Sequence, residues 1–384
     1  MTSIYDELGV RPVLNAQGNR TLLGGSTPSP AVSELMAAMG EYYVDLGELM
    51  DSVAIKISEM LGVERSLVTS GCSAALAVGA AACMTGDDPE KIKQIPDVTG
   101  MPNEFIIQKQ LRVRYDRCMT IPGGKLVEIG NEEETTADDL EAAIGPNTAG
   151  VHYLAPGTQP GALSIQEVIS IAHSNNVPVI VDAAGQVYPT DLLSSYVKMG
   201  ADLVAYGAKY FGAVNSSGIL TGRGDLVDIA RKHSFIGFEA GDSSSFGRPM
   251  KVDRQEVVGV YAALREWLTT NHEDRFAVYE VRISGLRDDL MDIPHIELSN
   301  YPQDGPPEGL LVHLDSPALG KTAVDVVKEL REGNPSIWVR SPNARPDAYP
   351  EGQNSFVIRM PTLKEGGEKI IAQRLREILA VAKP

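Results

Sequence analysis

Residues 179–184 read VIVDAA, a run of β-branched residues that leads into an aspartate and two alanines. Such a run predicts a strand buried on both faces, as in parallel sheets covered by helices on both sides. Ligands of these sheets bind at the carboxyl ends of the strands, which is where Asp182 lies. Asp182 is therefore a candidate binding residue, and helix capping is the alternative role.

Similar short apolar runs alternate with helical patterns on both sides of this strand. The predicted strands are 104–108, 125–129, 150–154, 177–182, 202–206 and 218–221. A helix follows the third of them, because Ser164 and Glu167 have the spacing of a capping box and apolar residues follow at helical intervals. This alternation predicts an α/β fold with a large, mostly parallel sheet.

The pattern changes near the C-terminus. Strands are predicted at 310–314, 337–340 and 356–360, with helices at 323–332 and from Glu365 onward, which is the pattern of a small α+β domain. We expect residues 1–48 to pack with this small domain and residues 49–253 to form the large domain. Residues 254–384 would contain an interdomain helix and the small domain itself.

Composition excludes several classes of function. The 384 residues carry a formal net charge of −17, which disfavours binding to nucleic acid. The N-terminus lacks the features of a signal peptide, and no apolar run reaches the roughly 20 residues of a membrane helix. Three cysteines without a paired spacing indicate a reducing cytoplasm, and six scattered histidines predict no metal site.

Two further features accompany Asp182. Lys209 follows the apolar strand at 202–206 and precedes Tyr-Phe-Gly. A surface lysine rarely has such apolar neighbours on both sides. The turn formed by Ser70, Gly71, Cys72 and Ser73 opens an alanine-rich helix, whose free N–H groups suit a phosphate. Each feature alone has an ordinary structural explanation. Together they supply the lysine, the acid and the anion site that a pyridoxal 5'-phosphate (PLP) enzyme needs.

Several ordered motifs extend this pattern to a resemblance. They are VLNAQG at 13–18, LGGS at 23–26, VTSGCSA at 68–74, IIQK at 106–109 and FGRPMKV at 246–252. They resemble the selenocysteine-synthase-like family of PLP enzymes, and within it the D-glucosaminate-6-phosphate ammonia-lyase type. The resemblance implies fold type I, the aspartate-aminotransferase-like fold, and a homo-oligomer of two or more subunits.

The resemblance also implies roles for individual residues. Lys209 would form the Schiff base with the cofactor and act as acid and base at the substrate, while Asp182 would pair with the ring nitrogen. Ala184 would pack on one face of the ring. The turn at 70–73 would hold the phosphate. Arg248 and Lys251 would add positive charge near the cofactor or substrate, unless they are simply a basic surface cluster.

One position departs from the subgroup, which commonly has a ring-stacking histidine where this chain has Leu111. An aliphatic residue there excludes water but offers neither stacking nor a proton. His152 lies near a strand end and can reach the site, although a hydrogen-bonded core histidine is the simpler interpretation.

Charge and position indicate which residues are candidates for binding the substrate. Arg359 lies on a predicted buried strand and can bind a carboxylate as a fork, or form an internal salt bridge instead. Arg20 and Arg112 are further candidates, with surface positions as the alternative, and Asn15 of the first motif is another.

We therefore expect a PLP-dependent lyase that acts on a small-molecule amino acid. The expected reaction is β-elimination from a β-hydroxy amino acid or amino-sugar acid, giving a 2-oxo acid and ammonia. Racemisation and aldol cleavage are alternatives that use the same Lys209 and Asp182. Transfer of selenium to seryl-tRNA is a further alternative, which the acidic charge disfavours, and a cofactor carrier without activity is another.

Overall fold

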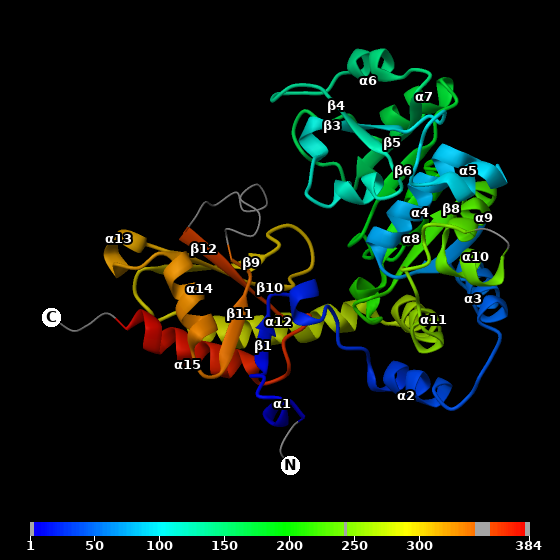
Figure 1. Ribbon diagram of the computed structural model, residues 1–384. Coiled ribbons are helices and arrows are strands. Elements are labelled where there is room, and N and C mark those ends of the chain that lie inside the picture. The colour runs from blue at the N-terminus through cyan, green and yellow to red at the C-terminus, as the bar shows by residue number, and fades with distance from the viewer. Residues whose placement is uncertain (1–3, 242–243, 342–353, 381–384) are drawn as a thin grey trace. The chain divides into compact units, whose positions relative to one another are not determined.

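The computed structural model describes residues 4–241, 244–341 and 354–380, and its contacts divide the chain into two compact units (Figure 1). The larger unit comprises Thr27–Thr269, and the smaller combines Met1–Ser26 with Thr270–Pro384. The larger unit thus extends beyond the expected range 49–253 at both ends. The reason is that α2 (Pro30–Met39) packs against α11 (Arg254–Thr269), where Arg254 Nε donates to the Met39 carbonyl at 3.0 Å.

A seven-stranded sheet forms the centre of the larger unit. Its strands run in the order β2, β8, β7, β6, β5, β3, β4. Neighbouring strands are parallel except around β8, which is antiparallel to both β2 and β7. Their bounds are β2 Arg65–Thr69, β3 Glu104–Gln108, β4 Lys125–Ile129, β5 Thr148–Leu154, β6 Val179–Asp182, β7 Leu203–Gly207 and β8 Gly218–Gly222.

Helices cover this sheet and complete the larger unit. The predicted capping box of Ser164 and Glu167 is confirmed at the start of α7, which packs on β5 and β6. Besides α2 and α11, the helices are α3 Leu46–Leu61, α4 Cys72–Thr85, α5 Pro89–Gln94, α6 Ala137–Ala143, α7 Ile165–Ser174, α8 Leu192–Lys198, α9 Gly224–His233 and α10 Phe235–Ala240. Short 3₁₀ turns are η2 Lys109–Leu111, η3 Asp116–Thr120 and η4 Ala208–Phe211.

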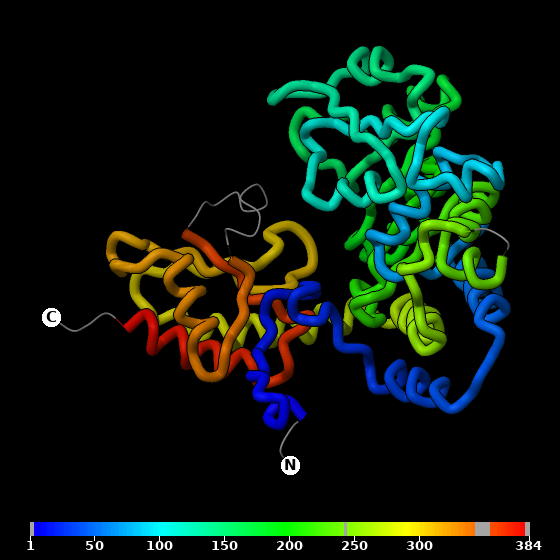
Figure 2. The backbone as a smooth tube through the Cα atoms, viewed as in Figure 1, coloured from blue at the N-terminus to red at the C-terminus, as the bar shows by residue number. Residues whose placement is uncertain are grey.

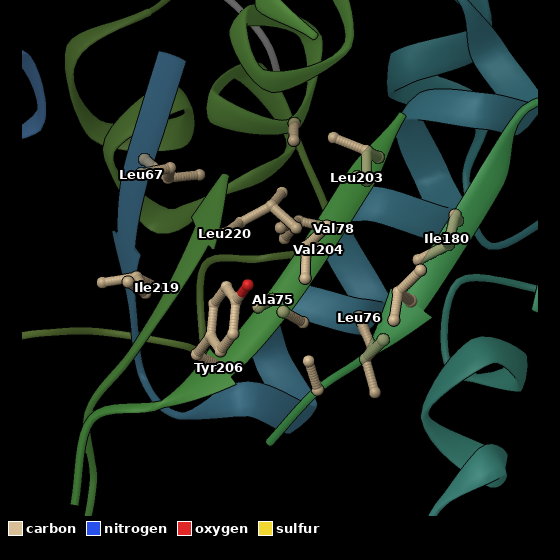
Figure 3. Close-up of a cluster of buried hydrophobic side chains, with 14 of the residues drawn as sticks. Leu67, Ala75, Leu76, Val78, Ile180, Leu203, Val204, Tyr206, Ile219 and Leu220 are labelled. Atoms are coloured by element: carbon tan, nitrogen blue, oxygen red, sulfur yellow. The ribbon is translucent and has the colours of Figure 1, made fainter. Parts of the chain in front are cut away.

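Helix α4 anchors the core because its small side chains let it lie close to the sheet. It packs against β5, β6, β7 and β8. Figure 3 shows Leu76 and Val78 of α4 among Ile180 of β6, Leu203 of β7 and Leu220 of β8, all of them almost fully buried. Burial of this apolar surface fixes the start of α4 relative to the ends of β6 and β7.

The smaller unit has its own core, built on an antiparallel sheet in the order β12, β10, β9. In Figure 2 the blue N-terminal segment runs beside the orange C-terminal part of this unit, because β1 pairs in parallel with β11. Strand β9 is absent from the predicted strands. The bounds are α1 Ile4–Glu7, β1 Val13–Ala16, η1 Thr21–Leu23, α12 His272–Asp288, β9 Ile296–Tyr301, β10 Gly309–Leu314, α13 Ser316–Leu319, α14 Ala323–Glu332, β11 Ser336–Val339, β12 Ser355–Arg359 and α15 Gly367–Leu379.

Two searches of the described residues gave negative results. No helix there is both long and apolar enough to cross a lipid bilayer. No group of three or more histidine, cysteine, aspartate or glutamate side chains there is arranged to hold a metal ion.

Candidate active site

Three strand ends meet at one edge of the large sheet. Strands β6 and β7 are parallel, and β2 runs in the same direction because it and β7 are both antiparallel to β8. The carboxyl ends of β2, β6 and β7 therefore lie at the same edge. Asp182 ends β6, the turn at 70–73 follows β2, and Lys209 follows β7. The three features that the sequence analysis selected thus converge.

The turn after β2 leaves the start of α4 open. Gly71 has φ +97°, a backbone conformation that favours glycine, and it caps the 14-residue helix α4 without a side-chain hydrogen bond. A Cβ atom at Gly218 would lie 2.5 Å from the Gly71 carbonyl carbon and 2.6 Å from the Cys72 nitrogen. Glycine at 218 therefore keeps space beside the first N–H groups of α4, which have no partner within the helix. Such a cradle suits a phosphate.

Asp182 is buried, with 5% of its surface exposed. Its Oδ1 accepts hydrogen bonds from the Ala184 N–H at 3.1 Å and from the Cys72 thiol at 3.5 Å. Among the described residues, both hydrogen bonds given to this carboxylate end on Oδ1. Its second oxygen is thus the one left for a ligand.

Lys209 lies in η4, directly after β7, and is half-buried. Its Nζ is 5.3 Å from the centroid of the Tyr210 ring. That ring borders the segment after Asp182, since a Cβ atom at Gly185 would lie 3.6 Å from it. Burial and Asp182 raise the pKa of the Cys72 thiol, while the Lys209 charge acts in the opposite direction, so Lys209, Cys72 and Asp182 lie within electrostatic reach of one another.

A buried histidine lies next to this group. His152 on β5 is 1% exposed, and neither ring nitrogen has a hydrogen bond of normal geometry to a described residue. Burial lowers the pKa of His152, so its ring is neutral. Its burial agrees with the interpretation as a core histidine, and a backbone contact with Ile180 on β6 acts on its pKa in the opposite direction to burial. The only sequence signal was its place on the strand beside β6.

Two of the candidate basic residues of the larger unit are engaged in internal ion pairs. Arg112 is exposed and bonds Asp116 and Glu128, each at 2.6 Å, which agrees with the alternative of a surface residue. Arg248 pairs with Glu239 and lies over the Phe238 ring at 5.8 Å. Lys251 is exposed.

Leu111, at the expected ring-stacking position, is fully buried in η2. Ala184 is half-buried, in the segment that begins at Asp182. Ser73 is exposed at the first turn of α4. Burial raises the pKa of the Cys118 thiol, and a hydrogen bond between the Ser73 side chain and this thiol acts in the opposite direction. The Ser73 hydroxyl thus already has a protein partner, the Cys118 thiol.

Three of the candidate substrate residues gather around Gly18 in the smaller unit. Asn15 Nδ2 donates to the Gly18 carbonyl at 3.2 Å, and the backbone N–H of the exposed Arg20 donates to the same carbonyl at 2.7 Å. Arg359 forms an ion pair with Glu308, and its Nη1 lies 3.1 Å from where a Cβ of Gly18 would be. The internal salt bridge of Arg359 is thus present. Its Nε is buried without a hydrogen-bond partner among the described residues, so this arginine retains a donor.

Comparison with known proteins identifies the family. Residues 38–245, more than half of the chain, match the aminotransferase class-V family. The chain belongs to this family. The D-glucosaminate-6-phosphate ammonia lyase of Salmonella typhimurium is 31% identical over 387 residues, which cover 98% of each chain.

Other relatives extend the comparison. The 5'-C-glycyluridine monooxygenase-decarboxylase of a Streptomyces species is 31% identical over 389 residues, covering 98% of this chain and 92% of that protein. The solved structure of a D-glucosaminate-6-phosphate ammonia-lyase has a TM-score of 0.84 and 29% identity, with 99% of both chains covered. An L-seryl-tRNA(Sec) selenium transferase of Moorella thermoacetica is 26% identical over 68% of this chain and 57% of its own.

These findings confirm the resemblance, the fold type I architecture and the cofactor. The chain is a PLP-dependent enzyme of the class-V family. The residues at the strand ends fit PLP. Asp182 has one oxygen without a hydrogen bond to the described residues, Lys209 supplies an amine, and Gly71 with Gly218 opens a cradle at the start of α4. Together these groups supply the partners that the aldehyde, the ring nitrogen and the phosphate of PLP require.

Proposed function

We propose that this chain catalyses β-elimination from a β-hydroxy amino acid or amino-sugar acid, yielding a 2-oxo acid and ammonia. The observation that carries this proposal is the likeness to an ammonia-lyase over 98% of both chains, combined with Lys209 and Asp182 at one sheet edge. PLP supplies an electron sink next to the substrate α-carbon when it is bound. The residues of this chain bind the cofactor and the substrate and move the protons.

Lys209 Nζ is the proposed base that removes the α-proton, since it lies at the end of β7 beside the segment that follows Asp182. Asp182 holds a proton on the ring nitrogen of the cofactor through its second oxygen. The N–H groups at Gly71, Cys72 and Ser73 bind the phosphate, with Ser70 and Arg248 as further contacts. Ala184 packs against the ring.

Elimination removes the α-proton and the β-hydroxyl group of the substrate, which leave together as water. The enamine that remains becomes an imine, and one water molecule hydrolyses it to the 2-oxo acid and ammonia. The net reaction therefore consumes no oxidant. The proposed substrate-binding residues are Arg359, Arg20, Asn15 and Arg112. Arg359 would bond the carboxylate through Nε, which has no hydrogen-bond partner among the described residues.

A second candidate is oxygen-dependent decarboxylation of an amino acid. The Streptomyces relative with 31% identity over 98% of this chain favours it, because its name states monooxygenase and decarboxylase activity. The two candidates differ in what they consume and release. Decarboxylation would take up O₂ and release CO₂, whereas elimination releases ammonia and does neither.

One experiment separates these candidates and the related PLP reactions. Purified protein loaded with PLP is incubated with D- and L-amino acids and with phosphorylated amino-sugar acids, with and without O₂. Ammonia, 2-oxo acid, CO₂, racemised substrate and aldehyde are measured separately. Ammonia with 2-oxo acid in equal amounts and no need for O₂ supports the proposal. Any other product as the main one would overturn it and assign the alternative reaction.

We further propose that the protein is a cytoplasmic homo-oligomer of at least two subunits. All three cysteines are free thiols, as expected in a reducing compartment. The connection between α2 and α3 exposes three large apolar side chains in a row, Tyr42, Tyr43 and Val44, with 95% of Tyr43 exposed. Contiguous exposed apolar surface of this kind marks an interaction site. The net charge of −17 supports a small-molecule partner rather than tRNA.

A further inference from the structure

Asp182 receives its two hydrogen bonds from different parts of the fold. The Ala184 N–H comes from the turn directly after β6, so it accompanies any aspartate that ends this strand. The Cys72 thiol comes from the first residue of α4, 110 positions earlier in the chain. The second contact therefore depends on how α4 packs against the sheet.

The packing of α4 makes this contact rigid. Cys72 is the first residue of a helix whose next turns are buried against β5 to β8, so its Cα has little freedom. The same turn forms the cradle beside Gly218. One short segment thus meets both the proposed phosphate site and the carboxylate of Asp182.

A thiol suits this position chemically. Sulfur is a weak and polarisable donor, so it orients a carboxylate while withdrawing little of its negative charge. Burial and Asp182 raise the pKa of Cys72, so the thiol keeps its proton and remains a donor.

We propose that Cys72 is a positioning residue that holds Asp182 Oδ1 and so presents the second oxygen to the ring nitrogen of the cofactor. Cys72 acts through Asp182 and does not contact the reacting atoms of the substrate. This inference rests on the proposed role of Asp182. It assigns the side chain of Cys72 to the carboxylate, while its backbone N–H remains part of the phosphate cradle.

The chain offers a matched control for this residue. Cys83 lies on the same helix, is likewise partly buried and has no hydrogen bond to Asp182 among the described contacts. The substitution Cys83→Ala therefore reports what the loss of a thiol from α4 does by itself. Cys72→Ser keeps a donor, and Cys72→Ala removes it.

The test measures the Kd of PLP for the cofactor-free protein by spectroscopic titration. Cys72→Ala should raise Kd about five- to tenfold, the range for losing one weak hydrogen bond to a charged group. Cys72→Ser should stay within about threefold of the parent and Cys83→Ala within about twofold, since each retains the Asp182 contact. Melting temperatures of the cofactor-free variants check that each is folded. A Kd for Cys72→Ala equal to that of Cys83→Ala would overturn the proposal.

A double substitution tests whether Cys72 acts through Asp182. In an Asp182→Asn background, Cys72→Ala should change Kd by less than about twofold, because the carboxylate that it orients is gone. An undiminished effect there would overturn the positioning role. ¹⁵N-labelled PLP adds a spectroscopic readout, since Cys72→Ala should lower the pH at which the ring nitrogen loses its proton. If Asp182→Asn alone leaves both Kd and the ¹⁵N signal unchanged, the proposed role of Asp182 at the ring nitrogen is wrong. This outcome differs from the one that would overturn the positioning role of Cys72 alone.

Discussion

Asp182 on β6 lies opposite Ala205 on β7 in the register of the two parallel strands. Only three residues separate Ala205 from Lys209, and two of them complete β7. The acid and the amine therefore reach the same sheet edge from neighbouring strands, although 27 positions separate them in the sequence. This register is the basis of the first two predictions.

Lys209→Ala should remove the covalent attachment of the cofactor. We expect the visible absorbance band of lysine-bound PLP and its reduction by borohydride to disappear. Turnover should fall by at least about a thousandfold, because the proposed acid–base group is gone. Absorbance spectra before and after borohydride, followed by peptide mapping, provide the measurement. Lys198→Ala on α8, an exposed lysine, is the control, and a normal reducible band in Lys209→Ala would refute the assignment.

Asp182→Ala should abolish turnover while leaving some cofactor bound. The carboxylate stabilises a protonated ring nitrogen, whereas the cradle at Gly71 and the amine of Lys209 still hold the other ends of the cofactor. Steady-state rates and the amount of PLP retained after gel filtration measure the two effects. The control is Asp191→Ala, an exposed residue before α8 without a side-chain capping bond. Near-normal rates in Asp182→Ala would remove its proposed role.

Arg359→Lys distinguishes substrate binding from an internal salt bridge. Lysine keeps the charge but loses the planar fork, so a carboxylate-binding role predicts a KM at least about tenfold higher and a kcat changed less than about threefold. Glu308→Gln removes the same ion pair without touching the guanidinium. If Arg359 serves only the ion pair, both variants should lower the melting temperature and leave KM unchanged.

Buried His233 should make folding stability depend on pH. Its ring is fully buried with Nε2 2.8 Å from Thr85 Oγ1, and burial lowers its pKa from 6.5 to about 4. The neutral form is thus favoured in the folded state. The contribution of His233 to the free energy of unfolding is fully present above pH 6.5. It decreases by about 3 kcal/mol as the pH falls from 6.5 to 4. Urea unfolding across this range measures it.

His233→Gln keeps a neutral partner for Thr85 and has no titrating ring. Its stability should therefore depend less on pH between 6.5 and 4 than that of the parent. Parallel curves for the two proteins would contradict the assignment to His233. The control His173→Gln alters a half-exposed histidine paired with Asp202, for which no comparable burial applies.

Tyr43→Glu should weaken self-association if the exposed apolar connection after α2 is a subunit interface. A buried carboxylate opposite a second subunit is costly to desolvate, so we expect the mass measured by light scattering to fall toward that of a monomer at low protein concentration. Val281→Glu introduces the same charge at an exposed apolar site on α12 of the smaller unit. Unchanged mass for Tyr43→Glu would place the interface elsewhere.

Local patterns were sufficient to predict several parts of this fold. The β-branched run before Asp182 forms β6, the capping box at Ser164 starts α7, and the Ser-Gly turn at 70–71 opens α4. These features depend on residues within a few positions of one another, so the sequence pattern shows them directly. Strand β9 was not predicted, since half of its residues are polar and it is only partly buried.

The amino-acid sequence alone determined the order of the turn, the acid and the lysine, and with it the PLP-dependent class of the enzyme. Local spacing encodes these features, because each lies at the end of its own strand. The tertiary structure decided how the side chains are engaged. The Cys72 thiol meets Asp182 across 110 positions, and Arg359 pairs with Glu308 across 51. Such contacts arise only when separate elements pack into a common core, and no local pattern specifies them.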